Sequence, residues 1–150
     1  MSAIMHVMVD IETLSVAPNA CILTLAVQQF HPLKDNDYDK LTHVYRRISV
    51  ESQLDRHVDD NTLAWWAKQP ELSKEEAFSE SDRYPLLDVL NEIRPLIWQS
   101  EYVWIQGPTF DLSVLKNAYE SYGIKEPWKY FLVRDARTVF SLVPDLKNLQ

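Results

Sequence analysis

Residues 5–14 read MHVMVDIETL, an apolar run ending in two acids, and this stretch decides the fold. The run predicts a β-strand over residues 6–10, in which side chains two positions apart share a face. Asp10 and Glu12 therefore project together from the carboxyl end of the strand. Two carboxylates this close repel each other unless a cation lies between them, and hard oxygen ligands suit Mg²⁺ or Mn²⁺. The alternative is that both acids merely end a strand and enter a loop.

The composition predicts one compact globular domain. The chain has 150 residues, 46% hydrophobic and 25% charged, enough for a domain that buries about 68–70% of its unfolded surface. Cys21 is the single cysteine, so we expect no internal disulfide and a reducing, cytoplasmic setting. We expect no membrane span, because no apolar stretch approaches ~18 residues. We expect no secretory signal, because the N-terminus has no basic segment followed by an apolar run. The net charge of −7 argues against broad binding to duplex nucleic acid, but it allows a small acidic site that receives one strand.

The rest of the chain predicts an α/β domain with a mixed sheet. Strands expected over residues 21–30 and 42–48 follow the first one in an antiparallel meander. Short strands over 102–105 and 132–133 then alternate with helices. The first expected helix runs from a cap at Asp59 or Asp60 to residue 68, and a second begins at a capping box over 73–76. A third covers 85–98, with a kink or early end at Pro95. The last two cover 110–122, with Gly123 as the C-terminal cap, and 136–142, after a cap at Asp135.

A third acid, Asp111, follows the strand expected over residues 102–105. It lies just after the turn at Gly107, in the first turn of the next helix. Sites in open α/β sheets form at the carboxyl ends of strands, so Asp111 would face Asp10 and Glu12 if the two strands are parallel neighbours. The alternative is that Asp111 only complements the helix dipole, which is worth ~0.3–1 kcal/mol. Three acids at one sheet edge favour a metal site.

Four segments resemble a known group of enzymes. Residues 9–13 (VDIET) and 107–111 (GPTFD) resemble the first two motifs of the DEDD (DnaQ-like) superfamily of 3′–5′ exonucleases. Residues 62–69 (TLAWWAKQ) and 134–138 (RDART) are similar to the phage and bacterial group that includes phage exonuclease A and exoribonuclease-like domains. The resemblance covers essentially the whole chain as a single exonuclease-like domain. Gln106 departs from it, because the superfamily often carries Asn there.

The resemblance implies a ribonuclease H-like fold and an enzyme that shortens single-stranded DNA or RNA from its 3′ end. The products would be nucleoside 5′-monophosphates, and the cofactors two divalent cations, Mg²⁺ or Mn²⁺. It implies that Asp10 bridges both ions, that Glu12 binds the ion carrying the attacking water, and that Asp111 supports the second ion. One ion would lower the pKa of the water, and the other would stabilise the leaving oxygen.

Substrate contacts are expected beside these acids. The loop after Glu12 would touch the terminal nucleotide, and aromatic side chains would support or stack on bases, at ~1–3 kcal/mol per base. For two adjacent tryptophans, the alternative is that one is in the core and the other covers it. Arg134 and Arg137 would meet phosphates or pair with acids. The candidate substrate-binding residues are Thr13, Leu14, Ser15, Asn19, Trp65, Trp66 and Phe110.

The third motif of the superfamily, a histidine followed five positions later by an aspartate, does not occur in this sequence. The residues five positions after the four histidines are Ile11, Asn36, Ile48 and Thr62. A tyrosine variant fits only Tyr84 with Asp88, which precede Asp111. The motif would follow residue 150, so we expect either a fragment of a longer chain or a protein that lacks its last helix. Exposed apolar surface, weak hydrolysis and self-association, for instance as a homodimer, are the expected consequences.

Two other functions stay open at this point. A phosphatase of the haloacid dehalogenase type also ends a strand with an acidic pair, but its chemistry requires Asp at both positions, and Glu12 is one methylene longer. A domain of the same fold that binds nucleic acid or a protein without cutting is the non-enzymatic alternative. Replacing Asp10 would separate these alternatives, because a pure binding module would not depend on it.

Overall fold

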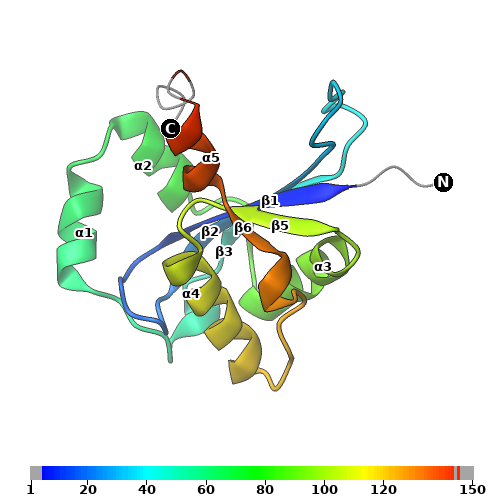
Figure 1. Ribbon diagram of the computed structural model, residues 1–150. Coiled ribbons are helices and arrows are strands. Elements are labelled where there is room, and N and C mark those ends of the chain that lie inside the picture. The colour runs from blue at the N-terminus through cyan, green and yellow to red at the C-terminus, as the bar shows by residue number, and fades with distance from the viewer. Residues whose placement is uncertain (1–4, 144, 146–150) are drawn as a thin grey trace.

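A mixed six-stranded sheet forms the centre of the computed structural model, which describes residues 5–143 and 145 (Figure 1). The strands lie in the order β4-β3-β2-β1-β5-β6. β1 pairs antiparallel with β2, and β2 with β3, whereas β5 runs parallel to both β1 and β6. The strands are β1 (His6–Thr13), β2 (Ile22–Phe30), β3 (His43–Ile48), β4 (Arg83–Tyr84), β5 (Tyr102–Ile105) and β6 (Val133–Asp135).

Helices cover both faces of this sheet. Figure 1 shows α3 and α4 together on one side, and α2 and α5 on the other. The larger core cluster packs α3 and α4 against the strands, and a smaller cluster joins the end of β1 and the start of β2 to α1 and α2. The described helices are α1 (Asp60–Ala67), α2 (Glu71–Phe78), α3 (Leu86–Trp98), α4 (Pro108–Ser121) and α5 (Ala136–Leu142), with short 3₁₀ turns at Glu51–Gln53 and Tyr130–Leu132. None of them is long and apolar enough to cross a membrane.

The alternation of side chains along β1 follows the expected period of two. Val7, Val9 and Ile11 are buried in the larger core. Asp10 and Glu12 therefore lie on the opposite face. The predicted antiparallel meander of the first three strands is confirmed, as is the strand at 102–105.

Several predicted boundaries differ from the structure. The capping box at 73–76 is wrong, because α2 begins at Glu71 directly after Pro70, which suits the start of a helix. Pro95 does not end α3 early. It lies on the exposed face of that helix, where solvent can satisfy the carbonyl that loses its partner. β4 was not predicted, because two residues are too short for a visible alternation.

Two buried polar side chains hold the connection between β1 and β2. The Gln53 amide accepts a hydrogen bond from the Ile22 backbone N–H at 2.8 Å and donates one to the Ile22 carbonyl at 2.8 Å. The Arg56 guanidinium donates to the Ala20 carbonyl at 2.9 Å and to the Asn117 side chain at 3.0 Å. These bonds tie the loop after Glu12 to β2 and to α4, which positions the end of β1.

Candidate functional site: an acidic cleft at the carboxyl end of the sheet

The three acids singled out from the sequence come together at one edge of the sheet. Asp10 and Glu12 project from the end of β1, and Asp111 is in the first turn of α4, which begins just after β5. β1 and β5 are parallel neighbours with Val9 opposite Ile105, so their carboxyl ends meet. The Ile11 backbone N–H, between the two acids of β1, is close enough to the Asp111 carboxylate to lower its pKa. The convergence predicted from the sequence is therefore present.

The charges of the three acids act on one another. The pKa of Asp111 is raised to about 7, first by partial loss of hydration and then by the negative charges of Asp10 and Glu12, while the Ile11 N–H and the charge of Arg137 lower it. Burial, and then the charge of Asp10, raise the pKa of Glu12. The Asp10 carboxyl is solvent accessible, yet the surrounding protein still removes enough hydration to raise its pKa. This concentration of negative charge is complementary to a cation.

The donor set fits hard divalent cations as an open site. Carboxylate oxygens are the ligands that Mg²⁺ and Mn²⁺ prefer, and Mg²⁺ usually keeps several waters and uses only one or two protein carboxylates. Within residues 5–143 and 145, no three His, Cys, Asp or Glu side chains converge tightly enough to form a ready-made cage. Asp10, Glu12 and Asp111 can therefore supply some of the ligands, and the other positions would fall to water or to substrate oxygens.

A cleft of about 690 Å³ opens beside these acids; Glu12 and Asp111 line it, whereas Asp10 does not. Its volume is in the usual range for a site that takes a small molecule or a nucleotide. It lies between the end of β1, the start of α1, the start of α4 and the first turn of α5. The lining residues are Ile11, Glu12, Thr13, Ser15, Val16, Asp59, Asn61, Thr62, Trp65, Trp66, Phe110, Asp111 and Arg137.

The two adjacent tryptophans of α1 have different environments. Trp66 is 6% exposed, packs edge-on against Phe78 and donates a hydrogen bond from its indole N–H to the Thr13 carbonyl at 3.0 Å. Trp65 is 54% exposed and meets Trp66 edge-on at 5.1 Å between ring centroids. Stacking of Trp66 on a substrate base is therefore excluded by its packing, whereas Trp65 offers a free ring at the cleft.

The other predicted contact residues divide into two groups. Thr13, Ser15 and Phe110 line the cleft. Leu14 and Asn19 do not line it. Leu14 is buried in the smaller core, and both its backbone N–H and its carbonyl are hydrogen-bonded, to Cys21 and Asp59. The prediction for Leu14 concerned the loop backbone, and both of its backbone groups already have partners within the protein.

Arg137 is the basic residue that lines the cleft, and the sequence offered it, together with Arg134, as a contact for phosphates or a partner for acids. Its guanidinium lies over Gly107, where an added Cβ would come within 2.8 Å of the Arg137 Nη1 atom. Gly107 also has a φ of 78°, which favours glycine. Asp135 fixes this arrangement, because one of its oxygens accepts from the backbone N–H groups of both Gly107 and Arg137.

Arg134, on the other side of Asp135, has a different role. Its guanidinium lies 4.2 Å from the centroid of the Tyr102 ring and donates to the carbonyls of Phe131 and Val133. It does not line the cleft. None of the four histidines, all of them among the described residues, lines the cleft either. His57 instead bonds the hydroxyl of Ser15.

The first prediction concerns the pH dependence of stability without metal. Because the folded pKa of Asp111, about 7, exceeds its ordinary value of 3.8, the folded protein holds more protons than the unfolded one between these pH values. The Asp111 contribution to the free energy of unfolding therefore decreases as the pH rises through this window. We therefore expect Asp111→Asn to have a higher melting temperature than the wild type at pH 8 in EDTA.

A matched control for this prediction is Asp88→Asn, since Asp88 is the first-turn acid of α3. The measurement is thermal unfolding at pH 4.5 and pH 8. If Asp111→Asn has a lower melting temperature than the wild type at pH 8, the carboxylate mainly stabilises its helix through the helix dipole. The claim that the three acids repel one another would then be refuted.

The second prediction separates the two tryptophans by stability. Trp66→Ala should lower the free energy of unfolding by about 3–5 kcal/mol, because it leaves a cavity and an unpaired Thr13 carbonyl. Trp65→Ala should change it by less than about 1 kcal/mol, because that ring is exposed. Urea unfolding measures both, and similar losses in the two variants would contradict the assignment.

Solved structures of other proteins share the fold of this chain. A product-bound exonuclease I matches with a TM-score of 0.66 and 13% sequence identity, over 98% of this chain and 33% of that one. The zinc-bound complex of E. coli exonuclease I with single-stranded DNA matches with a TM-score of 0.66 and 13% identity, over 98% and 31%. E. coli exonuclease I with a dT13 oligonucleotide matches with a TM-score of 0.64 and 13% identity, over 95% and 31%.

This chain thus spans about a third of those exonuclease I chains, and the likeness confirms the ribonuclease H-like fold. No curated protein sequence matches the chain significantly. The sequence itself matches a family model, the 3′-5′ exoribonuclease Rv2179c-like domain, over residues 5–150, and the chain therefore belongs to that family.

Proposed function

We propose that the cleft hydrolyses phosphodiester bonds at the 3′ end of a single nucleic-acid strand and releases nucleoside 5′-monophosphates. The observation that carries this proposal is the meeting of Asp111 with Asp10 and Glu12 at the edge of the sheet, in a member of an exoribonuclease-like family. The family assignment favours a nuclease over the phosphatase alternative. Residues 5–143 act as one domain in this proposal.

Asp10, Glu12 and Asp111 are the residues that would hold two divalent cations, Mg²⁺ or Mn²⁺. When bound, such a pair lowers the pKa of a water molecule and stabilises the leaving oxygen. The raised pKa values support this role, because burial raises all three and the neighbouring carboxylates raise those of Glu12 and Asp111 further, a repulsion that cations would relieve. The carboxylates must be ionised to bind metal, so activity should rise with pH through about 7.

Trp65 and Arg137 would orient the strand in the cleft. The exposed ring of Trp65 offers a stacking surface for a base, supported from below by Trp66. The Arg137 guanidinium has no ion pair or side-chain hydrogen bond to any described residue, so its donors remain available for a phosphate. A cation at this place would also offset part of the repulsion between an acidic cleft and an anionic strand.

The cleavage assay must decide whether the substrate is RNA or DNA. The family takes its description from an exoribonuclease, whereas the similar exonuclease I structures contain dT13 and dA16 oligonucleotides. No feature of the cleft described above selects the 2′-hydroxyl. We therefore propose a single-stranded substrate and compare both sugars directly.

Binding without cutting is the second candidate function. It is favoured by two observations on residues 5–143 and 145: no histidine lines the cleft, and no tight three-ligand metal group is present. A cleft without a histidine base should also turn over slowly. The same experiment distinguishes slow cleavage from binding alone.

The third prediction tests cleavage. With Mn²⁺ or Mg²⁺, the full chain should shorten 5′-labelled single-stranded RNA or DNA from the 3′ end. Asp10→Asn should reduce the rate by about 100-fold or more, because it removes charge stabilisation at the reacting centre. Asp60→Asn is the control, since Asp60 is an exposed acid of α1 that does not line the cleft.

Product analysis by chromatography identifies the nucleoside monophosphates. If the wild-type protein binds the strands but releases no mononucleotide, the proposed cleavage is contradicted and the domain is one that only binds nucleic acid. Equal rates for Asp10→Asn and the wild type would assign the cleavage to a contaminant.

The fourth prediction uses the two arginines beside Asp135 as a pair. Arg137→Gln should raise KM for an oligonucleotide by roughly 10-fold or more, because a charge-assisted bond to phosphate is lost. Arg134→Gln should leave KM within about 2-fold, since its contacts are to Tyr102 and to backbone carbonyls. An unchanged KM in Arg137→Gln would remove this residue from the substrate site.

A further inference from the structure

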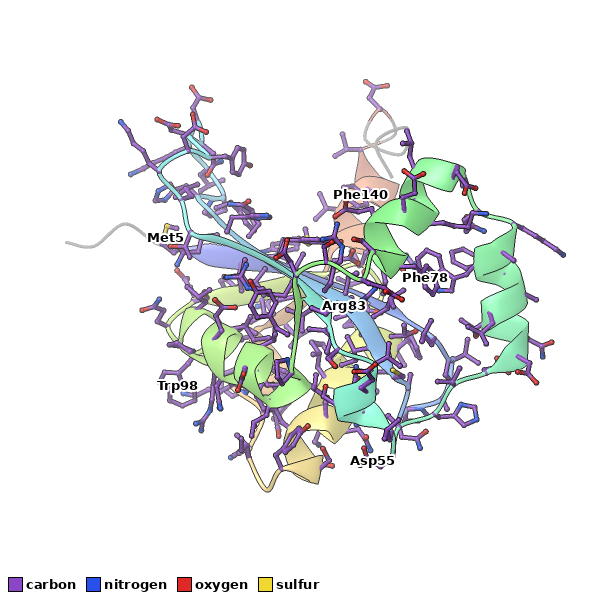
Figure 2. All side chains as sticks on the ribbon, turned by 180° about the vertical axis from the view of Figure 1, so that it is seen from behind. Met5, Asp55, Phe78, Arg83, Trp98 and Phe140 are labelled. Carbon is purple, nitrogen blue, oxygen red and sulfur yellow. The ribbon has the colours of Figure 1, made fainter. Side chains whose placement is uncertain are left out.

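A second surface with the chemistry of a nucleic-acid contact lies at the opposite end of β5 from the acidic cleft. Its centre is Trp98, the last residue of α3, whose side chain is 66% exposed. Figure 2 shows Trp98 and Phe78 on opposite sides of the molecule. β5 begins shortly after Trp98 and ends just before the turn that leads to Asp111. The two surfaces are thus separated by the length of a strand.

Two adjoining hollows flank the Trp98 ring. One, of about 380 Å³, is lined by Arg94, Pro95, Trp98, Lys125, Glu126 and Pro127. The other, of about 290 Å³, shares Trp98 and Pro127 and adds Lys129 at its rim. We name Arg94, Trp98, Lys125 and Lys129 the Trp98 surface. An exposed indole between two hollows has room for a flat group beside it.

The cations of the Trp98 surface lack partners within the described residues. Arg94, Lys125 and Lys129 occur in none of the ion pairs and none of the side-chain hydrogen bonds of residues 5–143 and 145. By contrast, Arg46, Arg47 and Lys74 are paired with acids. Glu126 is the one acid that lines either hollow. The Trp98 surface therefore has a local excess of positive charge on a chain of net charge −7. This charge is complementary to an anionic ligand.

We propose that the Trp98 surface binds a single nucleic-acid strand, as an accessory site separate from the cleft. A single strand alternates anionic phosphates with flat bases, and the two hollows combine cations with one exposed ring. An acidic peptide would satisfy the cations but would make no use of a ring that is free for stacking. This proposal does not require that the cleft cuts, because it concerns binding alone.

The test measures binding of a fluorescent oligothymidylate 15-mer by anisotropy, with the full chain in EDTA so that no cleavage occurs. Trp98→Ala should weaken binding by about 5- to 150-fold, the usual range for one base stacked on an aromatic ring. Lys125→Gln combined with Lys129→Gln should weaken binding and reduce the slope of log K against log salt by about 0.7 per lost phosphate contact.

Matched controls come from the loop between β2 and β3. Tyr38→Ala removes another exposed aromatic ring, and Lys34→Gln another cation without a described partner. Both should leave the affinity within 2-fold. Circular dichroism checks that each variant is folded, as expected for exposed positions.

Two results would overturn the proposal. One is an unchanged affinity in Trp98→Ala. The other is equally tight binding of an abasic strand of the same charge, which would show that the ring stacks on no base. In the latter case, competition by an oligoglutamate peptide that depends on Lys125 and Lys129 would assign the surface to acidic peptides instead. Failure of the cleft to cut leaves these outcomes unaffected, so the two proposals fail separately.

Discussion

The parallel pairing of β1 with β5 is the contact on which the candidate site depends. It sets Val9 opposite Ile105, so the turn after β5 and the first residues of α4 lie beside the end of β1. Without that register, Asp10 and Glu12 would be the end of one strand and Asp111 a first-turn helix acid. Each acid alone has an ordinary structural explanation. Their proximity, which together with burial raises the pKa of Asp111 to about 7, has no such ordinary explanation.

The surrounding structure holds these repelling charges in place. Gln53 and Arg56 tie the connection after β1 to its neighbours, and Trp66 closes the end of that strand with a hydrogen bond to Thr13. Asp135 joins the turn at Gly107 to the start of α5. Because these anchors lie outside the acidic group, the fold can tolerate local repulsion that a bound cation would relieve.

Charge is distributed unevenly between the two ends of β5. Acids gather at its carboxyl end, and unpaired cations surround Trp98 near its amino end. The net charge of −7 is an average over both regions, so it argues against a uniformly basic nucleic-acid surface but not against a local one. Both regions also present one exposed tryptophan, Trp65 and Trp98. The two proposed contacts with a strand are therefore compatible with the negative net charge of the chain.

The sequence by itself determined the features that depend on neighbouring residues: the shared face of Asp10 and Glu12, the helix cap at Asp135, the strands of the meander and the family resemblance. It left the cap of α1 open between Asp59 and Asp60, and the structure places it at Asp59. It missed the start of α2 because Pro70, and not the box at 73–76, begins that helix. Only the tertiary structure decided that Trp66 is buried while Trp65 is free, and that Arg137 enters the cleft while Arg134 does not. These distinctions arise from contacts between segments far apart in the chain, which local periodicity does not encode.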